Sequence, residues 1–183
     1  MDRRQRKTRE AIFSAFTTLL SQKSYHKISV QEIIDEADVG RTTFYAHFET
    51  KDFLLKALCE ELFEHIINPD DNHYRHCTFN GSDSLFLHLL YHIKKNDFHF
   101  VELLSSQNNE IFLRYFKSNL KQLILTQYDD KNMFGNKSLP KDYLINHISS
   151  SFVETVEWWI SGKMKESPEV ITEYFLSVIE PIL

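Results

Sequence analysis

The feature that most constrains the fold is a pair of short helical segments separated by a tight turn, at residues 29–47. Ser29-Val30-Gln31-Glu32 matches a capping box, in which the serine and glutamate side chains each bond a free backbone amide. Apolar residues then recur at positions 30, 33, 34 and 37, the spacing of one helix face. Asp38-Val39-Gly40 interrupts this pattern, and residues 41–47 read as a second short helix. Asp38 is expected to tolerate the left-handed backbone conformation that such a turn needs.

The rest of the chain also carries apolar residues at helical spacing, and no segment has the pattern of a β-strand. With 4 Gly and 4 Pro among 183 residues, the chain lacks the turns of a β-sandwich. We also expect Gly162 to form a left-handed cap at the end of the penultimate helix. The sequence therefore predicts an all-α fold of about nine helices, over residues 3–22, 30–37, 41–47, 50–66, 83–95, 97–105, 108–128, 140–161 and 168–180.

Charge is distributed unevenly along the chain. Residues 1–27 carry seven basic and two acidic side chains, a net charge of +5, so the remainder carries −10 of the total of −5. This pattern indicates that the N-terminal end meets a polyanion. No run of 18 apolar residues predicts a membrane span. Cys59 and Cys77 form no framework, so we expect reduced thiols and a cytoplasmic protein.

Two short helices behind a basic first helix are typical of a helix-turn-helix, whose second helix enters the DNA major groove. Ser29 and Lys51 stand at helix N-termini, where free amides and the helix dipole favour a phosphate. Arg4 and Lys7 add positive charge from the first helix. The exposed face of the second short helix offers side chains that can bond bases or phosphates: Arg41, Thr42, Thr43, Tyr45 and His47.

Residues 28–51 resemble the tetracycline-repressor (TetR) family. The resemblance rests on the capped short helix, the run Thr43-Phe44-Tyr45-x-x-Phe48 and the following Lys51, and it covers about residues 6–55. Two positions depart from the family pattern: Asp38 replaces a usual glycine in the turn, and Ile34 replaces a small residue. The resemblance implies that Thr42, Thr43, Tyr45 and His47 face DNA, and that Ser29, Tyr45 and Lys51 are among the phosphate contacts.

The resemblance also implies two domains and a homodimer. A three-helix DNA-binding domain would span residues 1–50. A helical domain for dimerisation and effector binding would span residues 51–183, with its first helix as a connector.

The C-terminal end has a resemblance of its own. Residues 152–160, Gly162 and Ser167-Pro168-Glu169 are similar to the last two helices of many members, which pair with their copies in a four-helix interface. The apolar stripe of the last helix could instead be covered by the protomer's own core, but we favour a dimer seam. The residues predicted to form this interface are Phe152, Val156, Trp159, Ile171, Tyr174, Phe175 and Val178.

The aromatic content, with 15 Phe, 8 Tyr and 2 Trp, is high for a helical protein and predicts a large interior or a pocket. A pocket would lie among residues 83–127 and the start of 140–161. Most of its candidate residues would serve equally well as core. The candidate effector-binding residues are Tyr91, His92, Phe98, Phe112, Tyr115 and Phe116.

Other chemistry has little support in the sequence. His73, His76 and Cys77 sit in a polar loop without an evident fourth ligand, and His88 and His92 are one helical turn apart without an H-E-x-x-H pattern. We therefore predict no metal site and no cofactor. The chain has no phosphate-binding glycine loop and no G-x-S-x-G motif, so we expect that it is not an enzyme.

The sequence thus predicts a transcriptional regulator. The favoured reading is a repressor that binds a near-palindromic double-stranded DNA operator as a homodimer and is released by a small-molecule effector. The alternative is a regulator, either a repressor or an activator, controlled by a protein co-regulator. A structural nucleoid protein with little sequence preference is disfavoured by the acidic body.

Overall fold

The computed structural model describes residues 3–67, 85–95, 100–105, 110–128 and 139–179, and these ranges contain helices and no strand. The all-α prediction is therefore confirmed. A single 3-10 turn, Tyr25–Lys27, lies in the connection that the sequence marks only as polar. The helices are α1 (Arg3–Gln22), α2 (Val30–Glu36), α3 (Arg41–His47), α4 (Lys51–Ile67), α5 (Leu85–Lys95), α6 (Phe100–Ser105), α7 (Glu110–Tyr128), α8 (Lys141–Ser161) and α9 (Pro168–Ile179).

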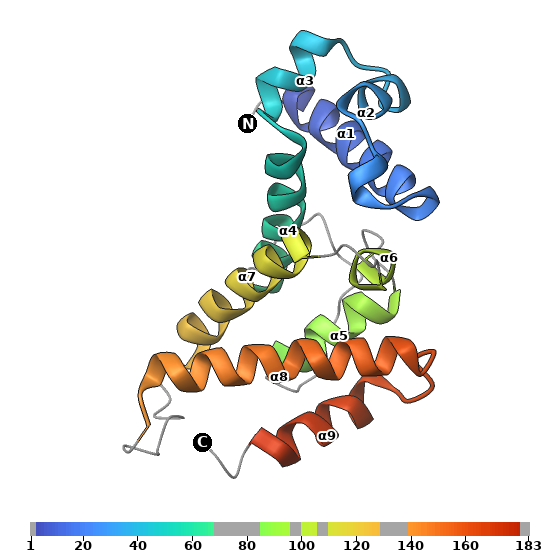
Figure 1. Cartoon of the computed structure of the whole chain (residues 1–183). Helices are drawn as coiled ribbons and strands as arrows, with labels where there is room; N and C mark the ends of the chain where they lie inside the picture. The colour runs from blue at the N-terminus through green and yellow to red at the C-terminus, as the bar shows by residue number, and fades with distance from the viewer. Residues whose placement is uncertain (1–2, 68–84, 96–99, 106–109, 129–138, 180–183) are drawn as a thin grey trace.

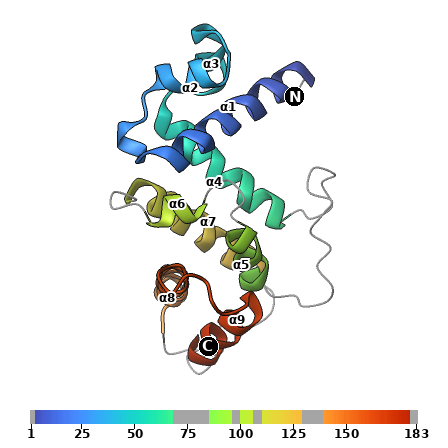
Figure 2. The same ribbon diagram turned by 90° about the vertical axis from the view of Figure 1, so that its right-hand side faces the viewer.

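Helices α1, α2 and α3 form one end of the molecule, and α8 with α9 forms the opposite end (Figure 1). Helix α4 leaves the α1–α3 end and packs mainly against α7, which in turn packs against α8. Helix α9 lies against α5 and α8, and the view turned by 90° shows the same order of layers (Figure 2). Within the described residues, no helix is long and apolar enough to cross a membrane.

The capping box at Ser29 forms as the sequence predicts. The Ser29 hydroxyl accepts a bond from the Glu32 amide at 3.2 Å, and the Ser29 amide donates to the Glu32 carboxylate at 2.9 Å. Thr50 accepts a bond from the Phe53 amide at 3.0 Å and so caps α4. Asp38 has a φ of 51° and supplies the left-handed residue of the turn between α2 and α3.

The prediction of a left-handed Gly162 is wrong. Gly162 ends α8 with a φ of −75°, and its amide donates to the Trp158 carbonyl at 3.0 Å. The two residues that follow have left-handed values, with φ of 62° at Lys163 and 48° at Met164. The helical hydrogen bonding continues through Gly162, so the reversal of the chain occurs one residue later than the glycine suggests.

The buried residues form one continuous core from α1 to α9, and phenylalanine rings link its parts. Phe63 of α4 contacts Phe116 of α7 with ring centroids 5.2 Å apart, and Phe112 lies between Phe116 and Phe100 of α6 at 5.7 and 5.6 Å. Much of the high aromatic content therefore fills the interior.

Candidate nucleic-acid interface

Helix α3 presents polar side chains outward because two phenylalanines fix its inner face. Phe44 and Phe48 are fully buried, and Phe48 packs against Phe13 of α1 with centroids 5.4 Å apart. The opposite face is exposed at Arg41, Thr42 and Thr43, whereas His47 is half-buried. The predicted exposure of this face is confirmed for every candidate except His47, which is only partly accessible.

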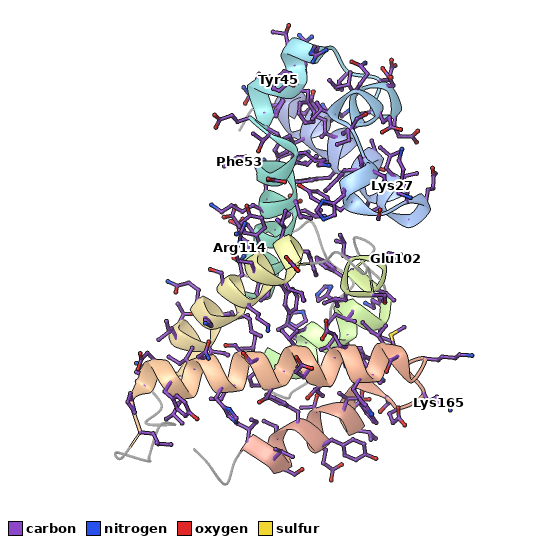
Figure 3. All side chains as sticks on the ribbon, viewed as in Figure 1. Lys27, Tyr45, Phe53, Glu102, Arg114 and Lys165 are labelled. Carbon is purple, nitrogen blue, oxygen red and sulfur yellow. The ribbon has the colours of Figure 1, made fainter. Side chains whose placement is uncertain are left out.

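Tyr45 is the large side chain of the exposed face. It is 45% exposed, and its ring packs edge-on against Phe44 with centroids 5.4 Å apart. The Arg41 guanidinium lies over the same ring at 5.9 Å. Figure 3 shows Tyr45 at the end of the molecule far from Lys165, which lies beside the α8–α9 connection. A rigid phenol beside a guanidinium can offer two hydrogen-bonding groups to one nucleic-acid groove.

The N-terminus of α2 already holds a carboxylate. Besides the capping bonds, the Ser29 hydroxyl donates to Glu32 at 2.9 Å, and Glu32 forms a salt bridge with Lys23. The Lys23 ammonium and the two Ser29 bonds lower the pKa of Glu32 to about 2, so this carboxyl is ionised at neutral pH. A phosphate at Ser29 would approach this negative charge, so a phosphate contact by Ser29 stays a prediction that requires Glu32 to move aside.

Lys51, the first residue of α4, has contacts within the protein. Its ammonium donates to the backbone carbonyls of Tyr25 at 2.9 Å and Ile28 at 2.6 Å, and it lies 4.3 Å from the centre of the Tyr25 ring. Two of the three N–H groups of the ammonium are therefore engaged within the protein. The sequence did not single out Tyr25, because it lies in a connection that appears polar.

Positive charge gathers at the N-terminus of α1. Arg4 and Lys7 are exposed, as are Arg3 and Arg6, and the first turn holds no acidic residue. The dipole of a helix makes its N-terminus positive, so basic side chains destabilise it there by about 0.3–1 kcal/mol each. A polyanion beside α1 would remove this repulsion. Arg9, which the sequence analysis did not select, instead turns inward over the rings of Phe13 and Phe48.

Two family models match this chain. The model described as "Bacterial regulatory proteins, tetR family" matches residues 12–58, and that described as "Transcriptional regulator C-terminal region" matches residues 81–181. The solved structure of a TetR transcriptional regulator from Streptococcus agalactiae 2603V is 33% identical, with 97% of this chain and 96% of that chain covered and a TM-score of 0.73. The chain belongs to the TetR family.

A second relative of this TetR-family chain has a named role. The dhaKLM operon transcriptional activator DhaS of Lactococcus lactis is 26% identical over 141 residues, which cover 76% of this chain and 72% of DhaS. A solved structure of the dihydroxyacetone kinase operon activator DhaS has a TM-score of 0.63 at 22% identity, covering 94% of this chain and 93% of that one. The family consists of DNA-binding transcriptional regulators rather than enzymes.

Most of the residues predicted for the dimer interface face the core of their own protomer. They are buried there, so they leave no surface for a second copy. Tyr174 and Val178 alone among them are exposed, at 51% and 68%. Trp158, which the prediction passed over in favour of its neighbour, is 56% exposed. The buried residues, for which the prediction is corrected, are Phe152, Val156, Trp159, Ile171 and Phe175.

The reason for this error is the geometry of a helix. Residues 152, 156 and 159 share one buried face, and α6, α7 and α9 of the same protomer pack on α8. Phe152 and Phe175 pack against Phe86 of α5 with centroids 5.0 and 4.7 Å away. Adjacent residues lie about 100° apart around the helix, so burying Trp159 turns Trp158 outward.

Five of the six candidate effector-binding residues lie in the described part of the chain. Phe112 and Phe116 are buried among the phenylalanine rings that link α4 to α6, and Tyr115 beside them is half-buried. The Tyr91 phenol donates to Glu169 of α9. Phe98 lies outside the described residues.

His92 is buried, with its Nε2 atom 3.1 Å from Nε2 of His88. The loop with His73, His76 and Cys77 lies outside the described residues. Within the described part of the chain, no group of three or more metal-ligating side chains occurs. Cys59 is a free, buried cysteine, and its burial raises the pKa of the thiol and so disfavours the reactive thiolate.

Proposed function

We propose that this TetR-family protein binds a near-palindromic operator as a homodimer and represses transcription until a small molecule releases it. The observation that carries the proposal is the outward face of α3, where Thr42, Thr43 and Tyr45 are exposed on a helix anchored by Phe44. A two-fold dimer would place two such helices in successive major grooves, with half-sites one helical turn or a multiple of it apart. Because DNA is the ligand, we place the protein in the cytoplasm.

The dimer part of the proposal rests on apolar side chains left uncovered on α8 and α9. Tyr143 and Trp158 of α8 and Tyr174 and Val178 of α9 are each more than half exposed. Large exposed apolar side chains on two adjoining helices favour an interaction surface at this end of the molecule. A second copy of the same two helices would cover them by two-fold symmetry.

A second candidate function is activation, with control by a protein partner. Two observations favour it: the Lactococcus relative is named as an activator, and the rings of Phe63, Phe100, Phe112 and Phe116 pack closely where a ligand would be expected. The two candidate functions predict opposite effects on transcription. Addition of the protein to a transcription reaction from its own operator lowers transcript for a repressor and raises it for an activator.

The deciding experiment is selection of bound sequences from a random double-stranded DNA pool at moderate salt. A single near-palindromic site, bound by two protomers, is the expected result. Bound sequences without a common element would contradict operator recognition. The selected site then provides the template for the transcription reaction and for a search for molecules that release the protein.

A further inference from the structure

The Lys51 ammonium makes three contacts within the protein beside the helix-turn-helix. It bonds two main-chain carbonyls 23 and 26 positions earlier in the chain, at Ile28 and Tyr25, and it faces the Tyr25 ring. The neighbouring residue of α4, Asp52, accepts a hydrogen bond from the Tyr25 hydroxyl. The first turn of α4 therefore contacts three groups of Tyr25: the backbone carbonyl, the ring and the hydroxyl.

These bonds act on the start of α2. The Ile28 carbonyl and the Ser29 amide belong to the same rigid peptide plane, so the ammonium that holds the carbonyl also orients the amide. The Ser29 amide in turn donates to Glu32 and completes the capping box. Helix α2 packs on α3, and thus the placement of α3 depends on where this peptide plane lies.

The surroundings of Lys51 also disfavour the neutralisation of a DNA phosphate. The side chain is half-buried, and its desolvation lowers the pKa of the ammonium, while the carboxylates of Asp52 and Glu32 oppose this shift. A phosphate contact would have to use the one N–H group that the two carbonyls leave, on an ammonium that is already partly desolvated. An exposed lysine such as Lys7 carries no such constraint.

We propose that Lys51 is a positioning residue, which fixes the N-terminus of α2 on α4 so that α3 is correctly aimed, and that it does not bind a DNA phosphate. This inference rests on the proposed operator binding. It replaces the phosphate contact that the sequence resemblance implies for this position.

Salt dependence separates the two roles. Each phosphate that a protein neutralises adds about 0.9 to the slope of log affinity against log salt concentration. Loss of a phosphate contact weakens specific and non-specific binding together, whereas loss of positioning weakens specific binding alone. We would measure both affinities between about 50 and 200 mM salt, using the selected operator and a scrambled duplex, for the wild type, Lys51→Met and Lys7→Met.

Lys51→Met is expected to weaken operator binding by about tenfold or more, with the slope and the scrambled-duplex affinity unchanged. Lys7→Met, the matched control, should lower the slope by about 0.9 on both duplexes. A Lys51→Met slope that falls like that of Lys7→Met would overturn the positioning role. A wild type that prefers no sequence would instead overturn the proposed function, and this inference with it.

Lys51→Arg keeps the charge and carries the test if Lys51→Met fails to fold. A guanidinium has a flat, wider donor array and does not reproduce a point charge held between two carbonyls over a ring. The positioning role therefore predicts weaker operator binding by Lys51→Arg, with scrambled-duplex binding retained. Binding by Lys51→Arg that equals the wild type on the operator would refute the proposal, because arginine serves a phosphate as well as lysine does.

Discussion

Substitution of Val178 by glutamate should dissociate the proposed dimer without unfolding the protomer. The valine side chain is 68% exposed on α9, so about two-thirds of its burial free energy remains available to a partner, roughly 1 kcal/mol. Two-fold symmetry counts this contribution twice, which gives about 2 kcal/mol for the dimer. The dimer Kd should therefore rise by at least about 30-fold, and a carboxylate facing an apolar surface would add to this effect.

Sedimentation velocity over a concentration series measures the dimer Kd, and circular dichroism reports whether the helices persist. Ser14→Glu is the matched control, since it adds the same charge at an exposed position of α1, at the opposite end of the molecule from α9. We expect Ser14→Glu to sediment as the wild type does. Wild-type sedimentation of Val178→Glu would refute the assignment of this face to the dimer.

Three further predictions test other parts of the structure. Phe175→Ala should destabilise the protein by about 3–5 kcal/mol, seen in urea unfolding, because its ring is buried against Phe86 and Phe152; a loss below 1 kcal/mol would contradict that packing. Tyr45→Ala should weaken operator binding while leaving sedimentation and the melting temperature unchanged, and an unfolded variant would show that Tyr45 belongs to the core. The folded-state pKa of Glu32, about 2, lies below its ordinary value of 4.5, so its stabilisation is present above about pH 4.5 and is lost as the pH falls towards 2. Glu32→Gln should flatten the decline of the melting temperature in that interval, and parallel pH curves for the two proteins would argue against the effect.

The local parts of the fold could be predicted because their causes are local. The capping box at Ser29, the Thr50 cap and the left-handed Asp38 each depend on residues within a few positions of one another, so the sequence contains the whole interaction. The burial of Phe44 followed in the same way from helical spacing. The exposed face of α3 could then be predicted as its complement.

Contacts between distant segments could not be predicted in this way. An apolar stripe reveals that a helix face is covered but not what covers it, and this is why Phe152 and Phe175 were assigned to a partner rather than to α5. The alternation within Trp158-Trp159 held a usable signal, since residues 152, 156 and 159 already define one inward face. The role of Lys51 depends on carbonyls more than twenty positions away, which no local pattern records.

The burial of Phe152, Trp159 and Phe175 within one protomer separates folding from assembly. A chain whose core is complete before it meets its copy can persist as a folded monomer when it is scarce. Occupancy of a two-fold operator would then rise with the square of protein abundance below the dimer Kd. A small change in expression would produce a sharper change in promoter output, so the proposed dimer would provide a concentration threshold without any effector.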